Sequence, residues 1–394
     1  MFRNMIKTLW NSRRSYRMLM IEQLLVFVVL VICFMSLFDM LGRYRDPGLL
    51  DTDDTVFFSM LIMPGTMSGA GVVESNSAFS AVLDNVRQWE QVEYITETSS
   101  FVPYLRSTEY YTKDTVRIAG VGFGVHHKYA EQDAQQVFKI KMTEGTWLPE
   151  TEGETPPVVI SQPLADEIDC VGSPIGLTLQ DSRNNTYKIS GIFPGIKEEP
   201  FTPAVPAVVY PVSSRGFLGP YYREVAFRIA PGTFSEFSMR LYNECRRLIP
   251  HFEKIDVGIH EVDEYKSKAM FPVTSRLKLM FLPTVILMLF AFVGTFGLLM
   301  LDVRRRASEY SLRRALGATR VSLMKTVLLQ SILITVISVF PGIILILTVS
   351  GVTSESLLAI AFAVVLMGFF SFASSLYPAW KISMVEPATI LREE

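Results

Sequence analysis

Cysteine and histidine are scarce in this sequence, with three and four of them among 394 residues. Cys33 falls in an apolar run. Cys170 and Cys245 have no flanking signature, so the spacing leaves open whether they are bridged or are unpaired core residues. His126 and His127 are adjacent and point to opposite sides of a strand, so we expect this pair at the surface. Neither a disulfide framework nor a metal centre is indicated.

Ionisable side chains are missing from three long apolar stretches, residues 279–301, 327–349 and 357–376. A fourth stretch, 21–40, lies near the N-terminus, and all four approach the roughly 20 residues that a membrane-spanning helix needs. With 49% hydrophobic residues and a mean hydropathy of +0.29, the chain is expected to be an integral membrane protein. Proton relays and ion pathways use ionisable groups inside the membrane, so their absence disfavours a proton-coupled carrier or an ion channel.

Basic residues are concentrated on one side of these spans. Residues 302–325 hold seven Lys or Arg against two acids, five basic residues precede the first span, and none lies in residues 350–356. Since loops rich in Lys and Arg stay inside the cell, both termini are predicted to be cytoplasmic and residues 42–277 to lie outside the membrane. The long apolar run and the lack of a small-residue cleavage site disfavour a signal peptide at the N-terminus.

The expected fold class is a membrane α-helical protein with four transmembrane helices in a one-plus-three layout and an α+β extracytoplasmic domain. The first segment can be an amphipathic helix on the inner leaflet or an ordinary basic flank. The expected segments are 1–18 (cytoplasmic amphipathic helix), 19–41 (transmembrane helix), 42–277 (extracytoplasmic domain), 278–301 (transmembrane helix), 302–326 (cytoplasmic coupling loop), 327–349 (transmembrane helix), 350–356 (external loop), 357–377 (transmembrane helix) and 378–394 (cytoplasmic tail).

The external domain shows two strand–helix–strand patterns, which together predict split βαβ units. The first comprises strand 55–63, helix 76–89 and strand 92–98, and the second comprises strand 224–229, helix 234–248 and strand 254–260. Between them, residues of about 104–222 are predicted to form an inserted β-rich subdomain, with a turn at Asn184 and Asn185 because asparagine tolerates positive φ. Its expected strands are 116–125, 157–161, 176–179, 187–192 and 207–211.

The cytoplasmic loop contains a short stretch that favours helix and ends at a glycine, which predicts a helix with an exposed apolar and basic face. We expect this face to dock on another protein, with polar contacts of the arginines and groove filling by the leucines. Anchoring to anionic lipid headgroups is the alternative role. Glu309 has a local alternative too, an ion pair with Arg305 or Arg313. Thr319 is a plausible cap for the next helix. The candidate coupling residues are Glu309, Tyr310, Leu312, Arg313, Arg314, Ala315, Leu316, Gly317 and Ala318.

Three passages resemble the permease subunits of MacB/FtsX-type ABC transporters, and with the helix layout the likeness covers nearly the whole chain. The loop from Glu309 to Ala318 is similar to the coupling region of the family in its glutamate and its Arg-Arg-Ala-Leu-Gly-Ala core. The C-terminal Tyr377-Pro-Ala-Trp-Lys, followed by Glu386-Pro387, is similar to the family's ending. Gly145-Thr-Trp, with the segments at 157–161 and 187–192, resembles the MacB periplasmic core domain.

The resemblance implies a permease that is driven by ATP and Mg²⁺ bound to a separate nucleotide-binding subunit. It also implies a second permease, as a homodimer or a heterodimer, in the bacterial inner membrane, with the large domain in the periplasm. No Gly-x-x-x-x-Gly-Lys-[Ser/Thr] loop occurs in the sequence, so we expect the ATPase to be another polypeptide. Membrane lipid and a periplasmic adaptor or lipoprotein are further expected partners. No nucleic-acid partner, no cofactor on this chain and no metal are expected.

Export, efflux or extraction of a substrate at the outer face of the membrane is the expected function. The alternative implied by the resemblance is an FtsX-like signalling element that regulates an external cell-wall hydrolase without transporting a substrate; the size of domain 42–277 favours the MacB type. A membrane-anchored enzyme is disfavoured because no nucleophile motif, metal cluster or glycine-rich cradle is found. The cargo is not identified by the sequence.

Overall fold

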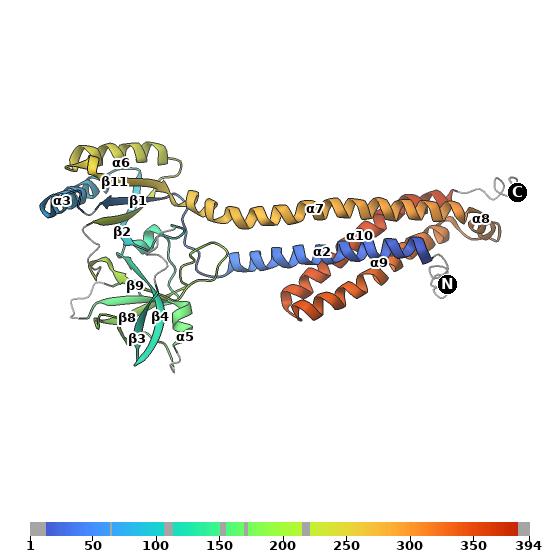
Figure 1. Cartoon of the computed structure of the whole chain (residues 1–394), viewed down its shortest axis with the longest axis horizontal. Coiled ribbons are helices and arrows are strands. Elements are labelled where there is room, and N and C mark those ends of the chain that lie inside the picture. The colour runs from blue at the N-terminus through green and yellow to red at the C-terminus, as the bar shows by residue number, and fades with distance from the viewer. Residues whose placement is uncertain are drawn as a thin grey trace. The chain divides into compact units, whose positions relative to one another are not determined.

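The computed structural model describes residues 13–63, 65–105, 113–149, 155–168, 172–214 and 221–384. The chain divides into two compact units, Gly42–Pro272 and a membrane unit made of Met1–Leu41 with Val273–Glu394 (Figure 1). Most of the predicted amphipathic N-terminal helix, the end of the predicted cytoplasmic tail and Cys170 lie outside the described residues.

Four helices in the described residues are long and apolar enough to cross a membrane, in agreement with the four predicted spans. Each helix is longer than its apolar run because polar residues extend it beyond the hydrocarbon thickness. The helix α7 begins within the Gly42–Pro272 unit, where Asp263 and Glu264 in its first turn suit the positive end of the helix dipole. The helices are α2 (Arg13–Arg45), α7 (Val262–Arg305), α9 (Arg320–Ser350) and α10 (Ser354–Ser383).

Hydroxyl groups join α9 to α10 inside the membrane unit. The Ser371 hydroxyl lies 2.7 Å from the hydroxyl of Ser331 and accepts a hydrogen bond from Thr335 at 2.8 Å. A tight connection between the two helices is capped by Thr353, whose side chain and the Ser356 side chain each bond the backbone N–H of the other residue. These contacts hold the two helices as an antiparallel pair.

The Gly42–Pro272 unit contains both of the predicted βαβ patterns. Strands in the order β11-β1-β10-β2 pair antiparallel, so each βαβ unit places its two strands on either side of a strand from the other. Phe58 of β1 stacks on Phe79 of α3 at 5.0 Å, and Phe227 of β10 meets Phe237 of α6 at 5.3 Å. The elements are β1 (Thr55–Ile62), α3 (Gly69–Val86), β2 (Val92–Ser99), β10 (Tyr222–Ile229), α6 (Phe234–Leu248), the short 3-10 helix η3 (Phe252–Lys254) and β11 (Ile255–Glu261).

The helix predicted over 76–89 begins earlier than expected, at Gly69. The Ser68 hydroxyl accepts a hydrogen bond from the Gly71 N–H at 3.2 Å and caps the helix there. The glycines and small residues of the first two turns carry no apolar periodicity, so the pattern indicated only the later part of the helix.

The β-rich part lies between these two patterns, and its described strands continue the same sheet. It joins the first group of strands through β2 and β4, which pair over Thr98 with Ala130 and Ser99 with Tyr129. The elements are β3 (Lys113–Ile118), β4 (Val121–Ala130), α4 (Ala134–Val137), β5 (Glu144–Gly145), β6 (Pro157–Ser161), α5 (Gln162–Glu167), β7 (Thr178–Gln180), β8 (Thr186–Phe193), β9 (Ala207–Pro211) and η2 (Val212–Ser214).

Two predictions in the β-rich part are wrong. The expected single strand 116–125 is a hairpin, because Ala119 and Gly120 take positive φ values of 50° and 84° and turn the chain between β3 and β4. The pair His126 and His127 is not at the surface: His126 is 3% exposed. The strand β4 is covered by pairing with both β3 and β9, and the His127 ring stacks on Tyr210 at 5.1 Å.

The expected turn at Asn184 and Asn185 is present between β7 and β8. Asn184 has a φ of 64°, and the Asp181 carboxylate accepts hydrogen bonds from the N–H groups of Arg183 and Asn185 at 2.9 and 2.8 Å. This is the local turn chemistry of asparagine and aspartate.

Candidate functional site

The cytoplasmic loop predicted to couple to a partner forms a short helix, α8 (Ala307–Ala315), between α7 and α9 (Figure 1). Gly317 ends it with a φ of 95°, and its N–H and that of Ala318 donate to the carbonyls of Arg314 and Arg313 at 3.0 Å. A left-handed glycine in this place closes the last turn of a helix. Thr319 then caps α9 by accepting a hydrogen bond from the Ser322 N–H at 3.2 Å. The sequence therefore dictates both the end of α8 and the start of α9.

One face of α8 is buried in the membrane unit. Tyr310 is 4% exposed and belongs to one apolar cluster with residues of α7, α9 and α10. Below it, Asp302 forms an ion pair with Arg306 at 3.0 Å and accepts a hydrogen bond from Gln330 of α9 at 3.2 Å. The cluster comprises Val303, Tyr310, Leu323, Val327, Ala379 and Ile382. Tyr310 therefore shares one apolar cluster with side chains from three spanning helices.

The opposite face of α8 is exposed, and we call it the elbow surface, made of Leu312, Arg313, Ala315 and Leu316. Leu312 is 59% exposed and Leu316 is 80% exposed. Arg313 forms an ion pair with Glu309 at 2.5 Å, which matches one of the two local pairings expected for that glutamate. Exposed leucines beside an arginine form a surface that a partner groove can bury, with a charge at its edge.

The candidate coupling residues thus separate into three groups: side chains held in the membrane unit, residues that shape the turn, and exposed side chains. Tyr310 points into the membrane unit and anchors α8, so it is not available to a partner. Arg314 is half-buried and donates to the Ser383 carbonyl of α10 at 3.4 Å. Gly317 and Ala318 shape the turn. The candidates whose side chains are exposed are those of the elbow surface, together with Glu309.

Local sequence patterns did not predict the contacts that hold α8 in the membrane unit. Asp302, Arg306 and Gln330 are brought together by three-dimensional packing, and only the i, i+4 spacing of the first two was visible in advance. Within the ranges that the structure describes, no group of three or more His, Cys, Asp or Glu side chains is placed to hold a metal ion. The buried Cys245 has no disulfide partner among these residues, and burial raises the pKa of its thiol to about 12.

Comparisons with solved structures find likenesses to extracytoplasmic domains. A domain of a putative permease protein from Porphyromonas gingivalis has 13% identity and a TM-score of 0.37, and the alignment covers 53% of this chain and 91% of that one. The periplasmic region of MacB from Actinobacillus actinomycetemcomitans has 12% identity and a TM-score of 0.34, covering 58% and 96%. The extracellular domain of the noncanonic ABC-type transporter YknZ from Gram-positive bacteria has 12% identity and a TM-score of 0.34, covering 52% and 99%.

Two sequence families match different parts of the chain. Residues 25–236 match the MacB-like periplasmic core domain, and residues 281–387 match the FtsX-like permease C-terminal region. No curated protein sequence matches the chain. Together the two matches cover the larger part of α2, most of the Gly42–Pro272 unit, the apolar part of α7, the elbow surface, α9 and α10. The chain therefore belongs to the MacB/FtsX family of ABC-transporter permeases, membrane proteins whose family implies an ABC ATPase partner.

Proposed function

We propose that this chain couples ATP hydrolysis by a separate nucleotide-binding subunit to movement of its extracytoplasmic domain, and so drives export, efflux or extraction of a substrate at the outer face of the inner membrane. The observation that supports the proposal is that α8 has one exposed face and one face buried in the membrane unit. Its elbow surface is open to a partner, while Tyr310 on its other face packs against α7, α9 and α10. A force that a partner applies to the elbow surface is thus transmitted to α7, α9 and α10.

The proposal includes the orientation and the assembly of the complex. Seven basic residues in 302–325 support a cytoplasmic elbow, and both termini then lie in the cytoplasm. The family implies a dimer of permeases, each bound to an ATPase subunit. ATP and Mg²⁺ belong to those subunits, and this chain contributes the surface that receives their movement.

The composition of the transmembrane helices favours a mechanism in which the extracytoplasmic domain moves the substrate over one in which the substrate passes between the helices. Three of the four spans hold no ionisable side chain in their apolar stretches, so they provide no charged path for a polar substrate. A substrate moved by the extracytoplasmic domain does not need such a path.

The test is Leu316→Asp in the complex reconstituted with its ATPase. Leu316 is 80% exposed, so the change leaves no cavity, but a carboxylate buried in a partner groove weakens binding by at least about tenfold. The matched control is Met239→Asp on α6, an apolar side chain that is 68% exposed and belongs to the other unit.

Co-purification of the ATPase and stimulation of its activity are the measurements. Loss of both in Leu316→Asp, with Met239→Asp unchanged, is the expected result. Equal ATPase binding and stimulation in the two variants contradict the role of the elbow surface. ATP-driven movement of the domain without any displaced substrate assigns the chain to signalling instead of transport.

A further inference from the structure

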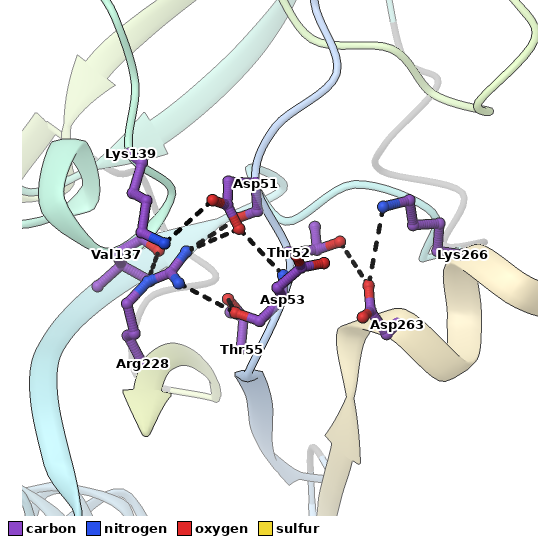
Figure 2. A network of polar contacts seen from close by, with 9 residues as sticks. All are labelled: Asp51, Thr52, Asp53, Thr55, Val137, Lys139, Arg228, Asp263 and Lys266. Carbon is purple, nitrogen blue, oxygen red and sulfur yellow. Dashed lines mark hydrogen bonds and ion pairs between the residues drawn. The ribbon is translucent and has the colours of Figure 1, made fainter. Parts of the chain in front are cut away.

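The segment that follows α2 contains four consecutive polar residues, Asp51 to Asp54, just before strand β1. Polar residues in such a connection are usually solvated. Thr52 is instead 0% exposed, and Asp51 is two-thirds buried by its side chain. Figure 2 shows this segment surrounded by side chains from three other parts of the Gly42–Pro272 unit.

Arg228 of β10 holds the two ends of this segment. It is 3% exposed, and its guanidinium donates to the carbonyls of Val137, Asp53 and Asp51 at 2.7, 3.1 and 3.3 Å, and to the Asp51 carboxylate at 3.1 Å (Figure 2). Lys139 forms a second ion pair with Asp51 at 3.2 Å. Burial raises the pKa of Asp51, but the hydrogen bonds from Arg228 and Lys139 outweigh it and lower the pKa below its ordinary value.

Thr52 holds the start of α7. Its hydroxyl donates to the Asp263 carboxylate at 2.7 Å, and Lys266 lies 3.9 Å from the same oxygen (Figure 2). Asp263 is in the first turn of α7, directly after Val262, which is fully buried in an apolar cluster. The chain that arrives from α2 and the chain that leaves through α7 are therefore joined by a direct bond.

The end of α2 is fixed by a different part of the unit. Lys197, which is 0% exposed and follows β8, donates through its ammonium to the Arg43 carbonyl near the end of α2. Its N–H also donates to the Gly48 carbonyl at 3.0 Å, and the ring of Phe201 lies 5.8 Å from that of Tyr44. The end of α2 is therefore bonded to the β-rich part. The helix α7, in contrast, follows directly from β11 of the βαβ part.

We infer that Asp51, Thr52 and Asp53, with Arg228 and Asp263, form a transmission joint that makes the two parts of the extracytoplasmic unit move together when α2 or α7 is displaced. This rests on the proposed function. The β-rich part receives the displacement of α2 and the βαβ part receives that of α7. Without the joint, the two parts are still connected through the apolar core, the short β2–β4 pairing and the hydrogen bond from the Glu97 N–H to the Glu131 carboxylate at 3.1 Å, but the segment after α2 is no longer bonded to the first turn of α7.

Thr52→Val is the sharpest test, because valine keeps the shape of threonine and loses only the bond to Asp263. Asp263→Ala removes the same bond from the other side, and the double variant should add little to either single change. Thr98→Val is the matched control: Thr98 is 1% exposed in the same unit, and its hydroxyl has no hydrogen-bond partner among the described residues.

The measurement is the distance between spin labels at Glu74→Cys on α3 and Val352→Cys between α9 and α10, with Cys170→Ser in the background. The complex with its ATPase is compared in nanodiscs without nucleotide and with ATP and vanadate. Thr52→Val and Asp263→Ala should lose at least about half of the ATP-dependent shift in distance, while ATP hydrolysis stays within about twofold of wild type.

A full shift in Thr52→Val and Asp263→Ala overturns the joint and leaves the proposed function intact. An equal loss in the control Thr98→Val also overturns it, since the effect is then one of general destabilisation. No shift in the wild-type complex overturns the proposed function, and the joint with it.

Discussion

At the scale of single residues, the least expected feature is the burial of a lysine in the sheet. Lys128 of β4 is 1% exposed, beside the carboxylates of Glu198 and Glu224. Burial lowers its pKa to about 8, although both carboxylates act to raise it. Strand β4 alternates around this position, but the alternation did not reveal that both of its faces are covered.

Lys128→Met is predicted to change how stability depends on pH. Because the pKa of Lys128 is 10.5 unfolded and about 8 folded, the unfolded state binds more protons between these values, and stability rises with pH across that window. Below about pH 8 both states are protonated, and the cost of burying the charge, on the order of 3 kcal/mol, is fully present.

Thermal unfolding of the full chain in mild detergent between pH 7.5 and pH 10.5 checks this prediction. Relative to Lys128→Met, the wild type should gain stability as the pH rises. The same pH dependence in both proteins would show that Lys128 does not titrate in this range.

At the scale of helices and strands, hydroxyl contacts inside the membrane unit set the pairing of α9 with α10. Ser371 is 4% exposed and bonds two hydroxyls of α9, those of Ser331 and Thr335. Such bonds between membrane helices contribute about 0.6 kcal/mol on average. They act at one height along the helices and so fix the register as well as the distance.

Ser371→Ala is predicted to destabilise the membrane unit by about 1 kcal/mol, because two hydroxyls of α9 each lose a partner. Thermal melting in detergent measures the effect. Ser77→Ala is the control, since the Ser77 hydroxyl bonds only the Val73 carbonyl of its own exposed helix turn. A melting temperature equal to that of the control variant would count against a role of Ser371 in holding the pair.

Periodicity predicted the elements whose apolar pattern is long and regular. The four spans and α6 were found because many residues repeat the same signal. The hairpin at Ala119 and Gly120 was missed because alanine seldom takes a positive φ and gives no turn signal. The start of α3 was missed because its first turns are rich in glycine and serine.

In the candidate site, too, the features that depend on local sequence were predicted and those that depend on tertiary packing were not. Gly317 and Thr319 are local signals, and they placed the end of α8 and the cap of α9. The burial of Tyr310 depends on Val303, Leu323 and Ile382 from three helices, which no local pattern brings together. The Arg228 contacts depend equally on strand order, so the sequence alone did not show them.

At the scale of the whole molecule, the orientation in the membrane is a prediction that labelling can test. A membrane-impermeant maleimide should react in intact spheroplasts with Glu74→Cys on α3. It should react with Ser308→Cys on α8 only after the membrane is opened, because the basic loop is expected inside. Both side chains are exposed, and the native Cys33 and Cys245 are buried, which limits background once Cys170 is replaced by serine.

Labelling of Ser308→Cys in sealed spheroplasts would reverse the assigned topology. It would also remove the elbow surface from the reach of any cytoplasmic ATPase. The Glu74→Cys result serves as the internal control for access of the reagent to the outer face.

The contact of Lys197 with the Arg43 carbonyl has a consequence for the response of the protein to its lipids. The ammonium meets the partial negative charge at the end of α2, so the last turn of this helix is set by the protein and not by the headgroup region. A bilayer that is a few Å thinner or thicker then leaves the length of α2 unchanged. The mismatch has to be absorbed by tilting of the helix or by deformation of the surrounding lipid.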